Sequence, residues 1–235
     1  MPGQNISLRA GSGAEFTAYL AAPDTQLQTA RASAVLVLQE IFGVNAFVRG
    51  VCDRFAEAGF MAIAPDLFWR QEPGVQLSET QHEQALRLLQ GLDQEQAIDD
   101  CSDAIGYISA LPDFSGRIGV VGYCLGGKLA YLLAARSKVD AAVSYYGVGI
   151  ENALGEAQSL TAPLLLHIAA EDPLCPATAQ ASIYAALENI AGVRIEIHPG
   201  VGHAFARRGG ATFVPEAAEN ADATTLAFLR QQLRV

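Results

Sequence analysis

The stretch Val120-Val121-Gly122-Tyr123-Cys124-Leu125-Gly126-Gly127 joins an apolar run to a helical pattern within about one turn. Residues 118–121 are typical of a buried strand, and residues 129–133 open a helix. The spacing Gly-x-Cys-x-Gly is typical of a nucleophile elbow, where a strained backbone requires small residues on either side. It predicts that Cys124 is a covalent nucleophile and that the amide of Leu125, at the helix start, points at the same place. Taken alone, the motif fits a buried structural cysteine equally well.

Composition limits the class of protein. The chain has 235 residues, of which 51% are hydrophobic and 17% charged, which predicts one large α/β domain over residues 1–235. A formal net charge of -10 disfavours nucleic acid and anionic membranes as partners, because both require a basic surface. The cysteine spacing, the lack of a signal-like N-terminus and the lack of a long apolar run favour reduced thiols in the cytoplasm. We expect no metal and no cofactor, since neither ligand spacing nor a phosphate loop is present.

Strand-like apolar runs alternate with helical patterns along the chain. This alternation predicts a mostly parallel central sheet with helices on both faces. The expected parallel strands are 34–38, 60–64, 118–121, 141–145, 164–168 and 193–197, with an antiparallel edge formed by 5–8 and 15–20. The expected helices are 46–58, 78–91, 93–110, 126–136, 177–190 and 216–232, and residues 68–74 are expected to form a loop at a strand's carboxyl end.

A thiol nucleophile needs a base and an acid that orients the base. His203 lies in a glycine-rich loop after the strand ending near residue 197, and Asp172 follows the strand 164–168. The chain order nucleophile, acid, histidine is that of the α/β-hydrolase fold, with each residue at the carboxyl end of an expected strand. Glu171 competes with Asp172 as the acid, although the adjacent Pro173 stiffens the loop in favour of Asp172.

Two other histidines receive structural interpretations. His167 falls inside an expected strand, where a hydrogen-bonded core histidine is the simplest reading. His198 precedes a proline turn, and we expect it to be exposed.

Five motifs together resemble the dienelactone hydrolase (carboxymethylenebutenolidase) family over nearly the whole chain. They are residues 39–45 (QEIFGVN), 65–67 (PDL), 122–127 (GYCLGG), 145–149 (YYGVG) and 202–207 (GHAFAR).

The resemblance implies a Cys124, Asp172, His203 triad and hydrolysis of an enol-lactone through a cysteine thioester. It implies that Glu40 interacts with the resting thiol and that the amide of Ile41 completes the oxyanion hole with that of Leu125. The alternative for Glu40 is a loop salt bridge.

The resemblance also indicates the substrate-binding residues. Arg207 matches a family arginine that binds the substrate carboxylate, whereas His82 and Leu86 stand where family members carry Arg and Tyr. The spacing of four places these two residues on one helical face. An exposed helix histidine with no substrate role is an equal reading of His82. Further expected substrate contacts are Tyr145, Phe42 and Trp69.

Other classes of protein share parts of this sequence pattern. A class I glutamine amidotransferase also has cysteine at such an elbow, but its histidine is followed two residues later by glutamate, and His203 is followed by Ala204 and Phe205. A non-enzymatic protein on this fold would lack a triad member. The remaining alternative is a carboxylesterase or thioesterase of broader specificity with the same triad.

Overall fold

The computed structural model describes residues 3–23, 31–136 and 139–234. The chain forms two compact units, Met1–Ile118 and Gly119–Val235, called below the first and second units. Strand β5 (Phe114–Tyr123) runs through the boundary between them. Within the described residues, no helix has the length and apolar character needed to cross a membrane.

The first unit contains strands β1 (Gln4–Arg9), β2 (Glu15–Ala21), β3 (Ala32–Leu38) and β4 (Met61–Pro65). β1 pairs with β2 and β2 with β4 in antiparallel fashion, while β3 and β4 are parallel with Val35 opposite Ala62. The antiparallel edge expected from the alternating N-terminal residues is therefore confirmed. β3 is buried along its whole length, as its unbroken apolar sequence requires.

Three α-helices complete the first unit. They are α1 (Ala46–Glu57), α2 (His82–Gln90), which follows the short 3₁₀-helix η1 (Glu79–Gln81), and α3 (Gln94–Ser109). The Tyr19 hydroxyl bonds to Asp53 of α1, whereas Phe16 stacks on Trp69, which bonds to Asp100 of α3. Because residues 16 and 19 of one strand point to opposite faces, α1 and α3 lie on opposite sides of the sheet.

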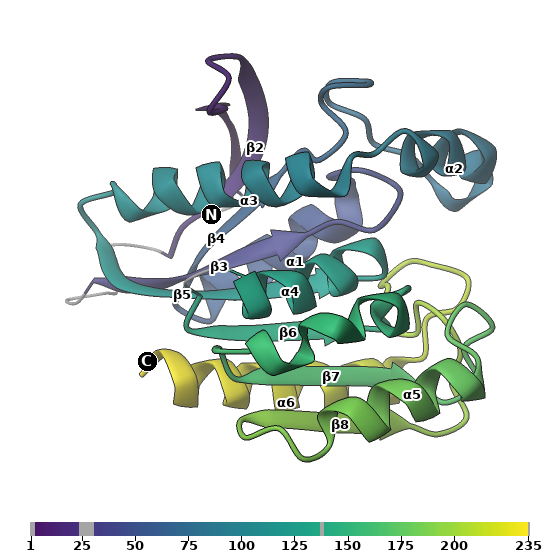
Figure 1. Cartoon of the computed structure of the whole chain (residues 1–235). Coiled ribbons are helices and arrows are strands. Elements are labelled where there is room, and N and C mark those ends of the chain that lie inside the picture. The colour runs from purple at the N-terminus through teal and green to yellow at the C-terminus, as the bar shows by residue number, and fades with distance from the viewer. Residues whose placement is uncertain (1–2, 24–30, 137–138, 235) are drawn as a thin grey trace. The chain divides into compact units, whose positions relative to one another are not determined.

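In the second unit β5, β6 (Ala141–Tyr145), β7 (Leu164–Ala169) and β8 (Val193–His198) form a parallel ladder. The helices are α4 (Leu125–Arg136), η2 (Ile150–Ser159), α5 (Ala177–Leu187) and α6 (Pro215–Leu233). α4 and α6 lie on opposite sides of these strands (Figure 1). A Cβ at Gly127 of α4 would lie 2.8 Å from Ser144 Oγ, while the neighbouring Tyr145 bonds to Thr225 of α6. The expected pattern of helices on both faces is thus present in each unit.

The helix boundaries follow their capping residues. Asn45 accepts a hydrogen bond from the Val48 amide at the start of α1, and Asp93 accepts from the amides of Glu95 and Gln96 at the start of α3. The 3₁₀-helix η2 was not expected, because only Ile150 and Ala157 in it are buried and no helical apolar stripe is visible in its sequence.

Candidate active site

Cys124 lies at the sharp turn between β5 and α4. Its φ of 54° is left-handed, a conformation that residues with side chains rarely adopt. The Cys124 amide donates to the Tyr145 carbonyl at 3.0 Å, and the Cys124 carbonyl accepts from the Gly127 amide at 3.0 Å. Such strain persists where surrounding structure enforces it, and functional sites are common locations. As the first residue of α4, Leu125 has an amide that no intrahelical carbonyl can satisfy. The structure therefore has the elbow that the glycine spacing predicts.

Gly122 is required by the close approach of the strand to the helix. A Cβ at this position would lie 1.9 Å from the carbonyl oxygen of Gly126. We therefore expect Gly122→Ala to lower the free energy of unfolding by more than about 4 kcal/mol, or to prevent folding. Denaturant unfolding measures this change. The matched control is Gly106→Ala in α3, where the new Cβ meets open space, and which should gain roughly 0.5–1 kcal/mol. A Gly122→Ala protein with the parent's unfolding midpoint would contradict the close approach.

Asp172 and His203 are joined by a hydrogen bond of 2.8 Å between Asp172 Oδ2 and His203 Nδ1. Asp172 is buried, and its Oδ1 accepts from the Leu174 amide at 2.8 Å. The competing acid, Glu171, is exposed. The carboxylate that faces the histidine is therefore that of Asp172. This bond holds His203 with hydrogen on Nδ1, which leaves Nε2 to act as a base.

Tyr146 links the elbow to the histidine, a contact that the sequence interpretation missed. The amide of Val148 and the carbonyl of Tyr145, on either side of Tyr146, both bond to Cys124, at 3.3 and 3.0 Å. The Tyr146 ring packs edge-on against His203, with centroids 5.1 Å apart. Tyr146 is left-handed (φ 38°), as is Ala204 (φ 62°), directly after His203. The repeated tyrosine in residues 145–149 marked this segment, but its backbone strain has no sequence signal.

Tyr145 lies away from solvent, and its contact with substrate stays a prediction. Its side chain is fully buried, and its hydroxyl bonds to Thr225 Oγ1 at 2.7 Å and Asp222 Oδ1 at 3.1 Å. Burial raises the pKa of Tyr145 well above its ordinary value. Since successive strand residues face opposite ways, Tyr145 points to the α6 side.

The interpretation of the two structural histidines is half correct. His167 is buried and bonds to His198 Nε2 at 2.9 Å and to Thr225 Oγ1 at 3.0 Å, as expected of a core histidine. His198 is not exposed but half-buried, with its ring against Phe205 at 4.8 Å. Burial lowers the pKa of both histidines. A proline following His198 did not indicate that its ring turns inward.

Apart from Trp69, the predicted site residues of the first unit lie in the segment between β3 and α1 or on α2. Glu40, Ile41 and Phe42 are all buried. The Phe42 carbonyl accepts from the Leu77 amide at 2.9 Å, and its ring lies 6.3 Å from that of His82. Leu86 is 38% exposed. The roles of Glu40 and Ile41 stay predictions from the family resemblance.

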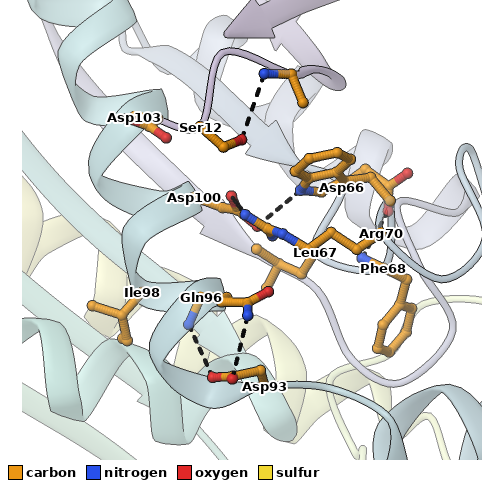
Figure 2. Close-up of polar contacts among 12 residues, drawn as sticks. Ser12, Asp66, Leu67, Phe68, Arg70, Asp93, Gln96, Ile98, Asp100 and Asp103 are labelled. Carbon is orange, nitrogen blue, oxygen red and sulfur yellow. Dashed lines mark hydrogen bonds and ion pairs between the residues drawn. The ribbon is translucent and has the colours of Figure 1, made fainter. Parts of the chain in front are cut away.

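Trp69 anchors the loop that follows β4. Its indole Nε1 donates to Asp100 Oδ2 at 2.9 Å, and its ring stacks on Phe16 and lies 4.2 Å from the Arg70 guanidinium. Arg70 in turn pairs with both carboxylate oxygens of Asp100, which is fully buried (Figure 2). These contacts give Trp69 a structural function. Its contact with substrate stays a prediction.

Burial makes the other three cysteines poor nucleophiles. Burial raises the pKa of Cys175 to about 11 and the pKa values of Cys52 and Cys101 further. All three are free thiols, and each is protonated at neutral pH. Among the described residues, no cluster of three or more His, Cys, Asp or Glu side chains could hold a metal ion.

A parallel sheet with helices on both faces, an elbow after one strand, and an acid and a histidine after two later strands define an α/β hydrolase. Within that class, the chain belongs to the dienelactone hydrolase family, whose model matches residues 16–233. Membership makes it a hydrolase of ester or lactone bonds, and it decides against the amidotransferase alternative.

Several known proteins are similar to this chain over nearly its full length. The chain is 44% identical to a protein of Azospirillum brasilense named "Putative carboxymethylenebutenolidase", covering 97% of this chain and 99% of that one. It is 37% identical to "Carboxymethylenebutenolidase 1" of Cupriavidus pinatubonensis, covering 97% of each. The crystal structure titled "Putative Dienelactone Hydrolase" from Klebsiella pneumoniae superposes with a TM-score of 0.84 at 26% identity, covering 97% of this chain and 99% of that one.

Proposed function

We propose that the protein opens a small unsaturated enol-lactone, of the dienelactone-to-maleylacetate type, through a thioester on Cys124. The observation that carries the proposal is the Asp172–His203 hydrogen bond. The segment 145–148 contacts both this pair and the strained turn, because one of its rings packs against His203 and its backbone bonds to Cys124. The relatives named carboxymethylenebutenolidase support the choice of an enol-lactone. The match of one family model to residues 16–233 supports a single domain. The free thiols Cys52, Cys101 and Cys175 support the cytoplasm as its compartment.

The mechanism follows from the bond between Asp172 and His203 Nδ1, which leaves Nε2 of His203 as the proton acceptor. His203 Nε2 accepts the proton of the Cys124 thiol, and the thiolate sulfur attacks the lactone carbonyl carbon. The amide of Leu125 and the positive end of α4 stabilise the resulting oxyanion. Collapse breaks the ring C–O bond, and the His203 imidazolium returns its proton to the departing enolate, which leaves a thioester on Cys124. Neutral His203 then takes a proton from water as the water oxygen attacks the thioester carbonyl carbon, and it gives this proton to the departing sulfur, which restores the thiol. Asp172 stabilises the imidazolium in both steps.

The second candidate is an esterase or thioesterase of broader specificity. The feature that favours it is the pair His82 and Leu86 on α2, where the resemblance to the dienelactone hydrolase family implies Arg and Tyr. Both side chains are accessible on this helix. Because one is an imidazole and the other a hydrocarbon, these two positions provide neither a permanent charge nor a hydroxyl donor. The two candidates differ in whether a carboxylate on the substrate is recognised.

Arg207 provides the test of carboxylate recognition. A hydrogen bond to a charged group contributes about 1.5–3 kcal/mol, so Arg207→Ala should raise KM for carboxylate-bearing lactones roughly 10- to 100-fold. It should leave KM for neutral p-nitrophenyl esters nearly unchanged. Steady-state kinetics on a small panel of both substrate types measures the difference.

Arg230→Ala is the matched control, because Arg230 is exposed on α6. It should change neither KM. If Arg207→Ala impairs charged and neutral substrates equally, carboxylate recognition is not the function of this residue. The broader esterase would then be the better description.

A further inference from the structure

A buried hydrogen-bonded network, called below the α6 network, connects three strands of the second unit to α6. On the strand side, His198 Nε2 lies 2.9 Å from His167 Nδ1, and His167 Nε2 lies 3.0 Å from Thr225 Oγ1. Thr225 Oγ1 lies 2.7 Å from the Tyr145 hydroxyl, which lies 3.1 Å from Asp222 Oδ1.

The network ends at an ion pair. Arg208 Nη2 donates to Asp222 Oδ2 at 2.9 Å. His167, Tyr145 and Thr225 are all at least nine-tenths buried, so none of them can exchange these partners for water.

The carboxylate at this end fixes the direction of every hydrogen bond. An ionised Asp222 only accepts, so the Tyr145 hydroxyl donates to it. The Tyr145 oxygen must then accept from Thr225, whose oxygen accepts from His167. His167 therefore carries its hydrogen on Nε2 and accepts at Nδ1, which requires a hydrogen on Nε2 of His198.

His198 connects the α6 network to the loop that carries His203. Its ring lies 4.8 Å from that of Phe205, and its carbonyl accepts from the Ala170 amide at 2.9 Å. Phe205 is fully buried, and its ring contacts Tyr146 at 5.6 Å. The rings of His198, before the loop, and Phe205, near its end, are thus in contact. His203 lies between these two residues in the chain, and its ring packs against the same Tyr146.

We propose that Thr225 is a positioning residue for His203, acting through the ordered tautomers of His167 and His198 and the ring of Phe205. Thr225 contacts no reacting atom. It determines which nitrogen of His167 bears hydrogen, and this determines how the His198 ring is held. The position of the His198 ring in turn determines where the 199–206 loop places His203. This role rests on the proposed function, in which His203 transfers protons.

The first test uses the unaltered protein. The chain has four histidines, so long-range ¹H–¹⁵N correlation spectra can assign the tautomer of each. The α6 network predicts hydrogen on Nε2 in both His167 and His198 at neutral pH. Hydrogen on Nδ1 of His167 would overturn the proposal, whatever the enzyme hydrolyses.

The second test replaces the Thr225 hydroxyl with a methyl group of similar size. Thr225→Val should lower kcat about 10- to 100-fold, the range expected when a catalytic group shifts by up to about 1 Å, with KM nearly unchanged. It should also move the His203 ring resonances and the acid limb of the kcat–pH profile. Thr225→Ser retains the hydroxyl and should restore all three readouts. Thr224→Val, one residue away on α6, is the matched control and should behave as the parent.

A purely structural role would change the unfolding midpoint but leave the His203 resonances and the pH profile in place, and that result would overturn the proposal. If Thr225→Val does not fold, His198→Gln decides. Glutamine can still donate to His167 but lacks the ring that contacts Phe205, so kcat should fall. An unchanged kcat in that variant would overturn the proposal. A parent protein without lactone or ester hydrolysis would instead overturn the proposed function, while the tautomer assignment would still stand or fall by itself.

Discussion

Cys124→Ala should lose at least about 10⁴-fold in kcat on lactones and on p-nitrophenyl esters, because the thioester cannot form without the sulfur. The fold should survive. The side chain is small, and the backbone of residue 124 makes hydrogen bonds that hold the elbow. Steady-state kinetics measures the loss, and circular dichroism with thermal unfolding checks the fold.

Cys52→Ala is the matched control for this experiment. Cys52 is buried in α1 as a free thiol, and its pKa is raised by burial. We expect some loss of stability from the missing sulfur and nearly full activity. Substantial hydrolysis by Cys124→Ala, at the parent's level for either substrate, would remove Cys124 from the mechanism.

Asp172→Asn should lower kcat about 10⁴-fold. The variant can keep the bond from the Leu174 amide, but an amide nitrogen facing His203 Nδ1 would require that atom to accept. The hydrogen would then move to Nε2, which could no longer take the thiol proton. The comparison of kcat with KM is informative here, because KM should change little.

Glu171→Gln is the control, since Glu171 is adjacent and exposed. It should retain the parent's kcat. Equal losses in the two variants would show that general charge near the loop matters, and not the specific bond to His203.

The elbow and the strand alternation were predictable because both depend on local sequence. A glycine two residues before Cys124 is required by a contact with Gly126, only four residues along, so the spacing carries the information. Strands β3, β4, β6 and β7 are buried along their whole length, and their apolar runs are visible in the local sequence. The predicted limits are short by up to four residues, as at β5, where residues 114–117, which do not continue the apolar run, extend the strand.

What could not be predicted depends on contacts between residues far apart in the chain. The family motif places Tyr145 among the expected substrate contacts, and it gives no sign that the Tyr145 hydroxyl bonds to Thr225, 80 residues away. The proline turn after His198 predicts an exposed ring, but the ring contacts His167 and Phe205. Nothing in the local pattern around Trp69 indicated that its indole bonds to Asp100, 31 residues further on.

The choice between Asp172 and Glu171 shows the same limit at smaller scale. Both are acids in one loop, and sequence favoured Asp172 only through the stiffness of Pro173. The structure separates them by burial, because Asp172 faces His203 while Glu171 faces solvent.

The central claim is that hydrolysis proceeds through an acyl group on the sulfur of Cys124. Rapid acid quenching of the parent protein within its first turnover, followed by peptide mass spectrometry, tests it most directly, because acid stops the reaction before water attacks the thioester. We predict an added mass equal to the opened lactone on the peptide containing Cys124, removable by hydroxylamine. Steady product formation with that peptide unmodified throughout, or with the acyl group on another residue, would contradict the account.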